Sequence, residues 1–356
     1  MKHSLAMYVG VMKMSINLKK LKMFLKDPDK KPYYKIFFEA LRAGIKEKEL
    51  PRHYFSKLLY RKDVNNYLDY VGSFRGVKIV KDLNKDNDNA ADILTNKLLF
   101  DYFFKDKEIR IPKMLGYNIK NVFYNNNQKI EVRNKEEFIQ LMKRWNSGND
   151  VFCKPIKGMQ GQNCYKLRTN SDNYMIEDKK FHNIINGSYI YQEVIKQHSK
   201  INEIYESAVN PLRIVTYLDD DNNIHHISSF MTFGIGKKNV SNNSSGGIFI
   251  PVDLNEGKLI GEAVQYLEYG GLQCTNHPNS GVEFDGFKVP FFEESLKIIE
   301  KAVEYLPIKL SGWDIAITED GPCIIEGNSF PSMASMDIGY GGLKSHPILG
   351  EVIEKF

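Results

Sequence analysis

The strongest structural signal in the chain lies in two neighbouring segments near its end, Gly312-Trp313-Asp314-Ile315-Ala316-Ile317-Thr318 and Cys323-Ile324-Ile325-Glu326-Gly327-Asn328. In both segments polar or small residues alternate with apolar ones, which is the period-two pattern of a strand with two different faces. The link Glu319-Asp320-Gly321 predicts a three-residue hairpin loop with glycine in the left-handed conformation. That loop length places Asp314 opposite Glu326.

Two carboxylates that face each other repel unless a cation or a proton lies between them. The amide oxygen of Asn328 adds a neutral ligand on the same face. Ligand sets made only of oxygen suit Mg²⁺ or Mn²⁺, and Mg²⁺ is commonly completed by waters and substrate phosphates. The pattern predicts a metal site at Asp314, Glu326 and Asn328. The alternative is a surface hairpin with ordinary charges, although Glu326 follows two isoleucines and is therefore expected near a core.

Length and composition indicate a globular protein. The chain has 356 residues, 42% hydrophobic and 26% charged, enough for two or three subdomains. Its four cysteines form no CxxC pair, so neither a disulfide framework nor a zinc site is expected, and a reducing cytoplasm fits best. The apolar stretch 5–12 is too short to span a bilayer and lacks the features of an export signal.

Positive charge is concentrated at the N-terminus. Residues 1–62 hold 16 Lys or Arg and 5 Asp or Glu, a net charge of +11 in a chain of net charge +5. The amphipathic stretch 18–26 predicts a peripheral contact with an anionic membrane, at the inner face of the membrane, or with a polyanionic substrate. The alternative is an ordinary solvated helix face. Nucleic acid is not an expected partner, because no recognised nucleic-acid-binding motif accompanies the charge.

The chain divides into three regions by pattern. Residues 1–90 are expected to form a helical, basic N-terminal region, because apolar residues in 33–70 recur every three or four positions and the polar segment 84–89 resembles a linker. Residues 91–195 mix short strands with a helix near 135–145, and residues 196–356 mix strands with a helix near 292–305. The fold class is therefore α+β.

A glycine-containing loop follows a predicted strand at Lys154-Pro155-Ile156-Lys157-Gly158-Met159-Gln160-Gly161. Gly158 and Gly161 allow the backbone to approach a ligand and direct its N–H groups inward, and Lys154 offers a positive charge to phosphates. A β-turn between two hairpin strands is the alternative. Motifs of P-loop NTPases, dinucleotide-binding folds, protein kinases and serine hydrolases do not occur.

Several motifs in a fixed order resemble the ATP-grasp superfamily. They are Lys97 in Asn-Lys at a helix start, Lys154-Pro with its glycine loop, the strand end Gln192-Glu193-Val194-Ile195, Arg213 in Asn-Pro-Leu-Arg-Ile-Val-Thr, and Asp314 twelve positions before Glu326-Gly-Asn328. Together they are more specific than any one alone. Over residues 90–356 the sequence is most similar to the sugar-transfer-associated ATP-grasp group, which is found with polysaccharide-synthesis enzymes.

The resemblance implies an ATP-grasp fold, in which two α+β subdomains enclose ATP. Residues 91–195 would be the small, or lid, subdomain, and residues 196–356 the C-terminal subdomain with the metal site. Lys97 and Lys154 would contact the nucleotide phosphates, and the loop Gly158–Gly161 would fold over them. The adenine would be bound by the segment with Gln192, Glu193, Val194 and Ile195.

The resemblance also assigns the opposite side of the nucleotide. Asp314, Glu326 and Asn328 would hold two Mg²⁺ ions, with Mn²⁺ as a substitute, and Arg213 would stabilise the transferred phosphoryl group. An arginine inside a strand pattern is otherwise expected to be paired in the core. Lys154 and Arg213 are the residues expected to act in catalysis.

The implied activity is that of an ATP-dependent carboxylate–amine ligase working through an acyl phosphate in cell-surface polysaccharide or glycan modification. Its substrates would be a small-molecule or glycan-linked carboxylate and an amine. One alternative is a kinase that transfers phosphate to a hydroxyl group. Another is a non-catalytic nucleotide-binding scaffold at the glycan machinery. The sequence does not specify the substrates or the oligomeric state.

Overall fold

The computed structural model describes residues 18–125, 128–147, 149–158, 161–170, 173–236 and 245–356. Within these ranges the helices are α2 (Leu18–Lys26), α3 (Tyr33–Glu47), α4 (Arg52–Ser56), α5 (Ser73–Leu83), α6 (Asp88–Thr95), α7 (Lys97–Phe104), α8 (Lys135–Asn146), α9 (Asp178–Asn186), α10 (Ser199–Ile204), α11 (Phe292–Tyr305), α12 (Met333–Tyr340) and α13 (Leu349–Glu354). None of the helices in these ranges is long and apolar enough to cross a membrane.

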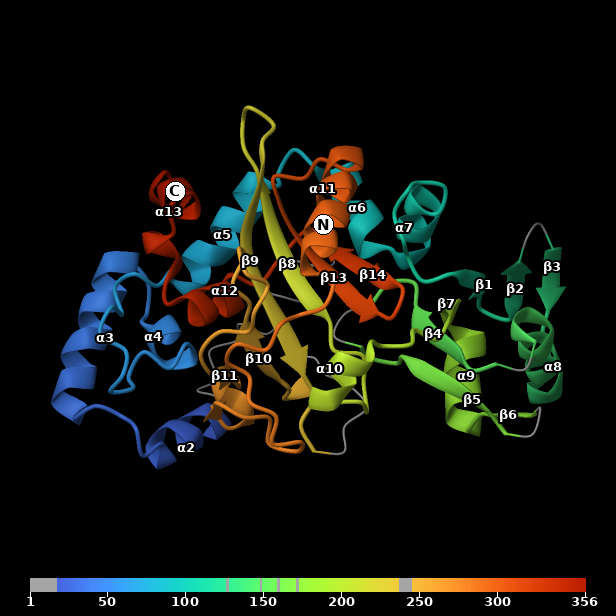
Figure 1. Ribbon diagram of the computed structural model, residues 1–356, viewed down its shortest axis with the longest axis horizontal. Helices are drawn as coiled ribbons and strands as arrows, with labels where there is room; N and C mark the ends of the chain where they lie inside the picture. The colour runs from blue at the N-terminus through green and yellow to red at the C-terminus, as the bar shows by residue number, and fades with distance from the viewer. Residues whose placement is uncertain (1–17, 126–127, 148, 159–160, 171–172, 237–244) are drawn as a thin grey trace.

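Two antiparallel sheets, each of seven strands in the described ranges, organise the molecule (Figure 1). The first sheet has the order β3-β2-β1-β7-β4-β5-β6, and its strands are β1 (Met114–Ile119), β2 (Val122–Asn125), β3 (Gln128–Glu131), β4 (Val151–Pro155), β5 (Tyr165–Asn170), β6 (Asn173–Met175) and β7 (Ser188–Glu193). The second has the order β12-β11-β10-β9-β8-β13-β14, and its strands are β8 (Leu212–Leu218), β9 (Ile224–Phe233), β10 (Ile248–Pro251), β11 (Ala263–Val264), β12 (Gln273–Cys274), β13 (Leu310–Thr318) and β14 (Gly321–Asn328). The mixture of sheets and helices confirms the α+β class.

The second sheet buries both of its faces. Along β8, Leu212 and Ile214 belong to the core on one face, whereas Val215 and Tyr217 belong to a core on the other face. This alternation follows from the period of a strand. The first of these cores also includes side chains of α6, α7 and α11, and the other face is covered by the N-terminal helices together with α12 and α13. Arg213 alternates with the first set, so it lies on the face of the N-terminal helices.

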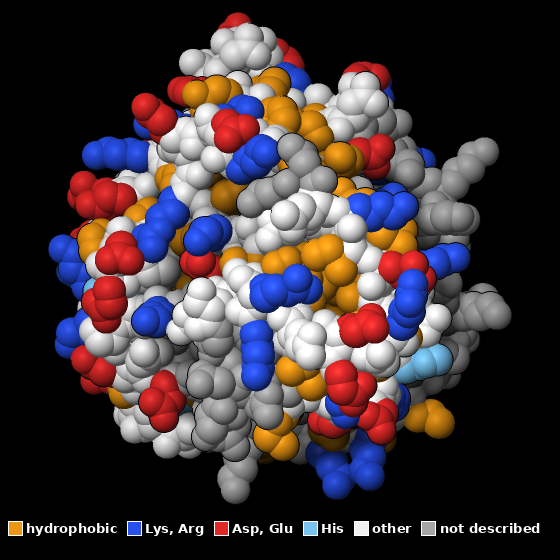
Figure 2. Space-filling view, turned by 90° about the vertical axis from the view of Figure 1, so that its right-hand side faces the viewer, with side chains coloured by type: hydrophobic (Ala, Val, Ile, Leu, Met, Phe, Trp, Pro, Cys, Tyr) orange, Lys and Arg blue, Asp and Glu red, His pale blue; other side chains and the backbone are white. Residues whose placement is uncertain are grey.

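The first sheet forms the opposite end of the molecule from α3 (Figure 1). Its core is aromatic, and Phe138 of α8 packs against Phe123 and Tyr191 of the sheet. Figure 2 shows the surface at this end, where basic and acidic side chains are interspersed with apolar ones.

The hairpin of β13 and β14 has the predicted alignment at Asp314 and Glu326 but a shorter turn than predicted. Thr318 pairs with Gly321, so only Glu319 and Asp320 form the loop, and Gly321 has a φ of +107°. A register shift near Ile325 then adds one residue on β14, which restores the pairing of Asp314 with Glu326. The expected three-residue loop was wrong, because a β-bulge supplies the extra residue instead.

The apolar stretch around residues 94–103 contains the helix start expected at Asn96-Lys97. It forms two helices, because Asn96 leaves the helical conformation and its side-chain oxygen accepts hydrogen bonds from the N–H groups of Leu98 and Leu99. Asparagine is among the residues most favoured at a helix N-cap. The break starts α7 at Lys97.

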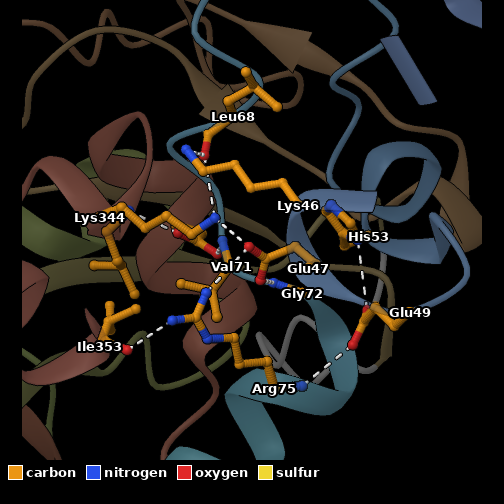
Figure 3. A network of polar contacts seen from close by, with 12 residues as sticks. Lys46, Glu47, Glu49, His53, Leu68, Val71, Gly72, Arg75, Lys344 and Ile353 are labelled. Atoms are coloured by element: carbon orange, nitrogen blue, oxygen red, sulfur yellow. Dashed lines mark hydrogen bonds and ion pairs between the residues drawn. The ribbon is translucent and has the colours of Figure 1, made fainter. Parts of the chain in front are cut away.

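Ion pairs anchor the N-terminal helices to the C-terminal helices. The carboxylate of Glu47, at the end of α3, lies between Lys344 and Arg75 and also accepts the N–H of Gly72 (Figure 3). Glu49 accepts the N–H groups of residues 73, 74 and 75 at the start of α5, at 2.6, 2.8 and 3.2 Å. These orphan donors at a helix start are thus satisfied by a carboxylate from another segment.

Candidate active site

Asp314 and Arg213 form a bidentate ion pair between neighbouring strands. The two residues are direct partners in the pairing of β13 with β8. The Nη2 atom of Arg213 donates to Oδ2 of Asp314 at 2.6 Å, and Nε donates to Oδ1. Burial acts to lower the pKa of the guanidinium, but the Asp314 carboxylate outweighs it and the pKa is raised. The arginine is both paired and close to the carboxylates.

Glu326 faces Asp314 from β14 and changes its ionisation. Burial and the charge of Glu326 together raise the pKa of Asp314 to about 6, against the opposing effect of Arg213. For Glu326, burial also acts to raise the pKa, but Lys97, Lys154 and Arg213 outweigh it and the pKa is lowered. The pKa values of the two facing carboxyl groups are thus shifted in opposite directions, as expected when opposed acids share a proton or a cation.

Two lysines reach this pair from other elements. Lys154, which is 4% exposed at the end of β4 in the first sheet, donates from Nζ to the carbonyl of Ile325 at 3.4 Å. Lys97, at the start of α7, lies with Nζ 3.9 Å from Oε2 of Glu326. Burial lowers the pKa of Lys154 to about 8, an effect that Glu326 opposes and Lys97 reinforces. Both sheets therefore contribute charged groups to one place.

The start of α7 is tied to the glycine-containing loop. The Nζ atom of Lys97 donates to the carbonyl of Gly158 at 2.8 Å, and its backbone N–H donates to the carbonyl of Ile156 at 3.0 Å. Gly161 has a φ of +69°, which favours glycine. Met159 and Gln160, at the tip of the predicted lid, lie outside the described residues. Two hydrogen bonds thus connect Lys97 with the loop.

Asn328 lies two residues beyond Glu326, at the end of β14 opposite Gly312. Its Oδ1 accepts the N–H of Phe330 at 2.8 Å, which fixes the side chain. An amide or carboxylate oxygen can accept more than one interaction. The donor set of two opposed carboxylates and one amide oxygen, with the pKa of one carboxyl raised, fits Mg²⁺ or Mn²⁺.

The segment expected to bind adenine lies at the end of β7. Gln192 is buried, and its Nε2 donates to the carbonyl of Pro112 at 3.3 Å. Glu193 pairs with Lys113 at 2.8 Å, and Val194 and Ile195 follow, both half-buried. Because β7 pairs directly with β4, this segment lies beside the strand that carries Lys154.

The family is decided by a profile match along most of the chain. The profile described as sugar-transfer associated ATP-grasp matches residues 78–348. The chain belongs to this ATP-grasp family. The comparison with curated proteins found no match.

Solved structures with a similar arrangement carry the names of ligases and synthetases. The ATP-grasp ligase PsnB, complexed with minimal precursor, Mg and ADP, has a TM-score of 0.40 and 12% identity, over 77% of this chain and 61% of the PsnB chain. D-alanyl-alanine synthetase A from Vibrio cholerae has a TM-score of 0.43 and 11% identity, over 75% of this chain and 65% of its own. This ATP-grasp chain thus spans less than two thirds of the length of either protein.

One charged residue near the ATP-grasp site was missed by the sequence patterns. Asp101 lies one turn after Lys97 on α7, is 3% exposed, and has its pKa raised to about 6 by burial, an effect that Lys105 and Lys154 oppose. The available signal was a single carboxylate inside the apolar run Lys97–Phe104. An aspartate is rarely buried unless it is paired with another group.

Proposed function

We propose that the protein is an ATP-dependent ligase that joins a carboxylate to an amine through an acyl phosphate. The observation that carries the proposal is the meeting of Lys97 and Lys154 with Glu326 and its partner Asp314. Membership of the ATP-grasp family supports ATP as the co-substrate.

Each group has a proposed task. Lys97 and Lys154 bind the phosphates, the Gly158–Gly161 loop covers them, and the segment 192–195 binds the adenine. Asp314, Glu326 and Asn328 would hold Mg²⁺, for which Mn²⁺ could substitute, and the metal would supply charge neutralisation for the phosphates. The contact with Asp314 holds Arg213 at fixed geometry, and Arg213 would stabilise the transferred phosphoryl group.

The proposed reaction has two steps. A carboxylate oxygen of the substrate attacks the γ-phosphorus of ATP, the bond to the β–γ bridging oxygen breaks, and ADP leaves. The amine nitrogen then attacks the acyl carbon, inorganic phosphate leaves, the nitrogen loses a proton, and an amide remains. Water must be excluded between the steps, which is the task of the covering loop. Such chemistry depends on positioning and charge more than on a protein nucleophile.

The setting is proposed from the family description and from charge. We place the reaction in cell-surface polysaccharide or glycan modification, on the cytoplasmic side of the membrane, with peripheral contact through residues 1–62. Residues 1–17 of that segment lie outside the described residues. Within the chain, residues 91–195 act as the lid subdomain and 196–356 as the C-terminal subdomain, with 1–90 as the helical N-terminal region.

The test is a screen for ADP release across uronic acids and amino acids, with and without amines, using ATP labelled at the γ-phosphate. A ligase leaves the label as free phosphate and yields an amide of the expected mass. Label retained on the product would indicate a kinase instead. ATP binding by calorimetry without turnover of any substrate would favour the nucleotide-binding scaffold, and absence of ATP binding would contradict both activities and the scaffold.

A further inference from the structure

Helix α3 has three faces with different properties. At 100° per residue, Ile36, Glu39, Ala40, Ala43 and Glu47 fall on one stripe, and all of them are buried. A second, wider stripe carries six large apolar side chains that are 49 to 70% exposed: Tyr33, Tyr34, Phe37, Phe38, Leu41 and Ile45. A surface helix normally presents charged or polar residues on the side away from the core. Here a broad apolar face is left open.

The open apolar face continues beyond α3. Leu18, Leu21 and Leu25 of the neighbouring α2 are also exposed, at 77, 42 and 52%. A groove of about 530 Å³ runs beside α3, and Phe24, Phe37, Leu41, Ile45 and Leu50 contribute to its lining. Of the 18 large apolar residues that are exposed in the described ranges, ten lie between positions 18 and 50. Such a concentration marks an interaction surface.

The third stripe of α3 is basic. Lys35, Arg42 and Lys46 lie together between the apolar and the buried stripes, and all three are exposed. They border the apolar face along its length. This pattern differs from the first-sheet end of the molecule, where both signs of charge are mixed (Figure 2).

The acidic residues of this region are turned inward. Asp27, Glu39 and Glu47 are buried in ion pairs with Arg61, Lys31 and Lys344. Glu49 is bonded to the start of α5. In residues 18–52 this leaves only Asp29 as an exposed carboxylate. The outer surface of α2 and α3 is therefore apolar and positive.

We propose that α2 and α3 form a docking surface for an anionic lipid bilayer, with the aromatic stripe of α3 in the headgroup region and Lys35, Arg42 and Lys46 against the lipid phosphates. Aromatic and aliphatic side chains beside basic ones are the pattern of interfacial helices. A soluble polyanion would match the charge but would leave the apolar stripe exposed. The inference specifies the membrane contact of the proposed function and is independent of the ligase chemistry.

Flotation of the full chain with phosphatidylcholine vesicles, with and without phosphatidylglycerol, tests the proposal. We expect binding only to vesicles that contain the anionic lipid. Binding should be lost at high salt, where the Debye screening length falls to about 3 Å. No flotation with anionic vesicles would overturn the proposal.

Paired variants identify the surface. Phe37→Ser with Phe38→Ser should weaken vesicle binding on the order of tenfold or more, because two exposed rings no longer enter the bilayer. Lys35→Gln with Arg42→Gln should weaken it on the order of tenfold. The matched controls are Met175→Ser with Tyr305→Ser for exposed apolar residues, and Lys179→Gln with Lys297→Gln for exposed charges. Equal effects of test and control pairs would overturn the assignment to α3.

A fluorescent probe reports insertion directly. The tryptophan introduced by Phe37→Trp should shift its fluorescence emission to shorter wavelength when anionic vesicles are added. The emission of the unmodified protein, which comes from the native tryptophans, is subtracted. Tyr305→Trp, on α11, should show no shift. The opposite pattern would contradict the proposed orientation.

Other occupants give distinct outcomes. If a second copy covers the face, light scattering will show a dimer that Phe37→Ser with Phe38→Ser dissociates, and vesicles will not bind. If residues 1–17 cover it, only a chain starting at residue 18 will float. Either result overturns docking by the full chain.

Glu326→Gln should float like the unmodified protein while losing ATP turnover, so failure of the ligase proposal remains distinguishable from failure of this one.

Discussion

The hairpin of β13 and β14 and the junction between α3 and the C-terminal helices are made from the same chemical groups, carboxylates beside Lys and Arg side chains. At the junction, burial acts to raise the pKa of Glu47, but Lys344, the N–H of Gly72 and Arg75 outweigh it and the pKa is lowered. At the hairpin the pKa of Asp314 is raised to about 6, because burial and Glu326 outweigh a bidentate arginine.

The opposite pKa shifts of Glu47 and Asp314 indicate different roles for the charges at the junction and at the hairpin. At the junction each carboxylate finds enough donors within the chain, so the interaction contributes to folding (Figure 3). At the hairpin two opposed carboxylates repel each other, and a bound cation would relieve this repulsion. The raised pKa of Asp314 therefore distinguishes the hairpin from the junction, where the pKa of Glu47 is lowered. Four predictions test this contrast, from the largest expected effect to the smallest.

Asp314→Asn and Glu326→Gln should each reduce ATP-dependent ADP release on the order of a thousandfold, because each removes charge needed to hold the metal and the phosphates. Circular dichroism should show an intact fold. The control is Asp320→Asn in the turn of the same hairpin, whose carboxylate is 84% exposed and should not matter for turnover. Full activity of either site variant would contradict the metal site.

Glu47→Gln should lower the free energy of unfolding by about 3 kcal/mol, because Lys344 and Arg75 lose their shared buried counter-charge. Denaturant titration measures it, and ADP release per folded molecule should not change. Glu203→Gln, which breaks an exposed pair with Lys200, should change stability by less than about 1 kcal/mol. A loss of activity without a loss of stability would contradict the division between scaffold and site.

Asp101→Asn should raise the free energy of unfolding at neutral pH, whereas Glu47→Gln should lower it. The raised pKa of Asp101 means that the folded state binds its proton more tightly than the unfolded state does, so its contribution to stability is lost as pH rises from about 4 to about 6. At pH 7 the variant should be more stable than the unmodified protein by on the order of 2 kcal/mol, and at pH 4 the two should be equal. For Glu47, whose pKa is lowered, the stabilising contribution should instead disappear as pH falls through its folded-state value. A variant difference that does not depend on pH would contradict the assignment.

Gly321→Ala should cost about 1 kcal/mol of stability, because the φ of +107° is unfavourable for alanine although no neighbouring atom lies within 4 Å. Thermal unfolding measures this effect. Gly339→Ala, in α12 without a positive φ, is the matched control and should be neutral or slightly stabilising. Equal effects would show that backbone strain at the turn is unimportant.

Elements with long, regular patterns were predictable from the sequence. The helix Phe292–Tyr305 occurs as expected, because burial of one face imposes a clear period. The helix start at Asn96-Lys97 was expected from the motif, although the apolar residues continue on both sides of it. In that case a local cap overrode the periodic pattern.

At the site, local alignment was predictable and long-range contacts were not. The alignment of Asp314 with Glu326 was predicted correctly although the expected loop length was wrong, because the β-bulge near Ile325 supplies the residue that the loop lacks. The pairing of Arg213 with Asp314 depends on which strand lies beside β13, and the sequence only offered pairing or a binding site as alternatives. The contacts of Lys154 and Lys97 with β14 and its Glu326 depend on how the two sheets are packed, which has no local signature.

The bulge near Ile325 has a consequence for how this hairpin can vary in length. The extra residue sits between the turn and Glu326, so a turn longer by one residue combined with a regular β14 would present the same side chains in the same order. What must stay constant is the pairing of Asp314 with Glu326. Insertions at the tip are therefore compatible with the site when the two strands above it keep this register.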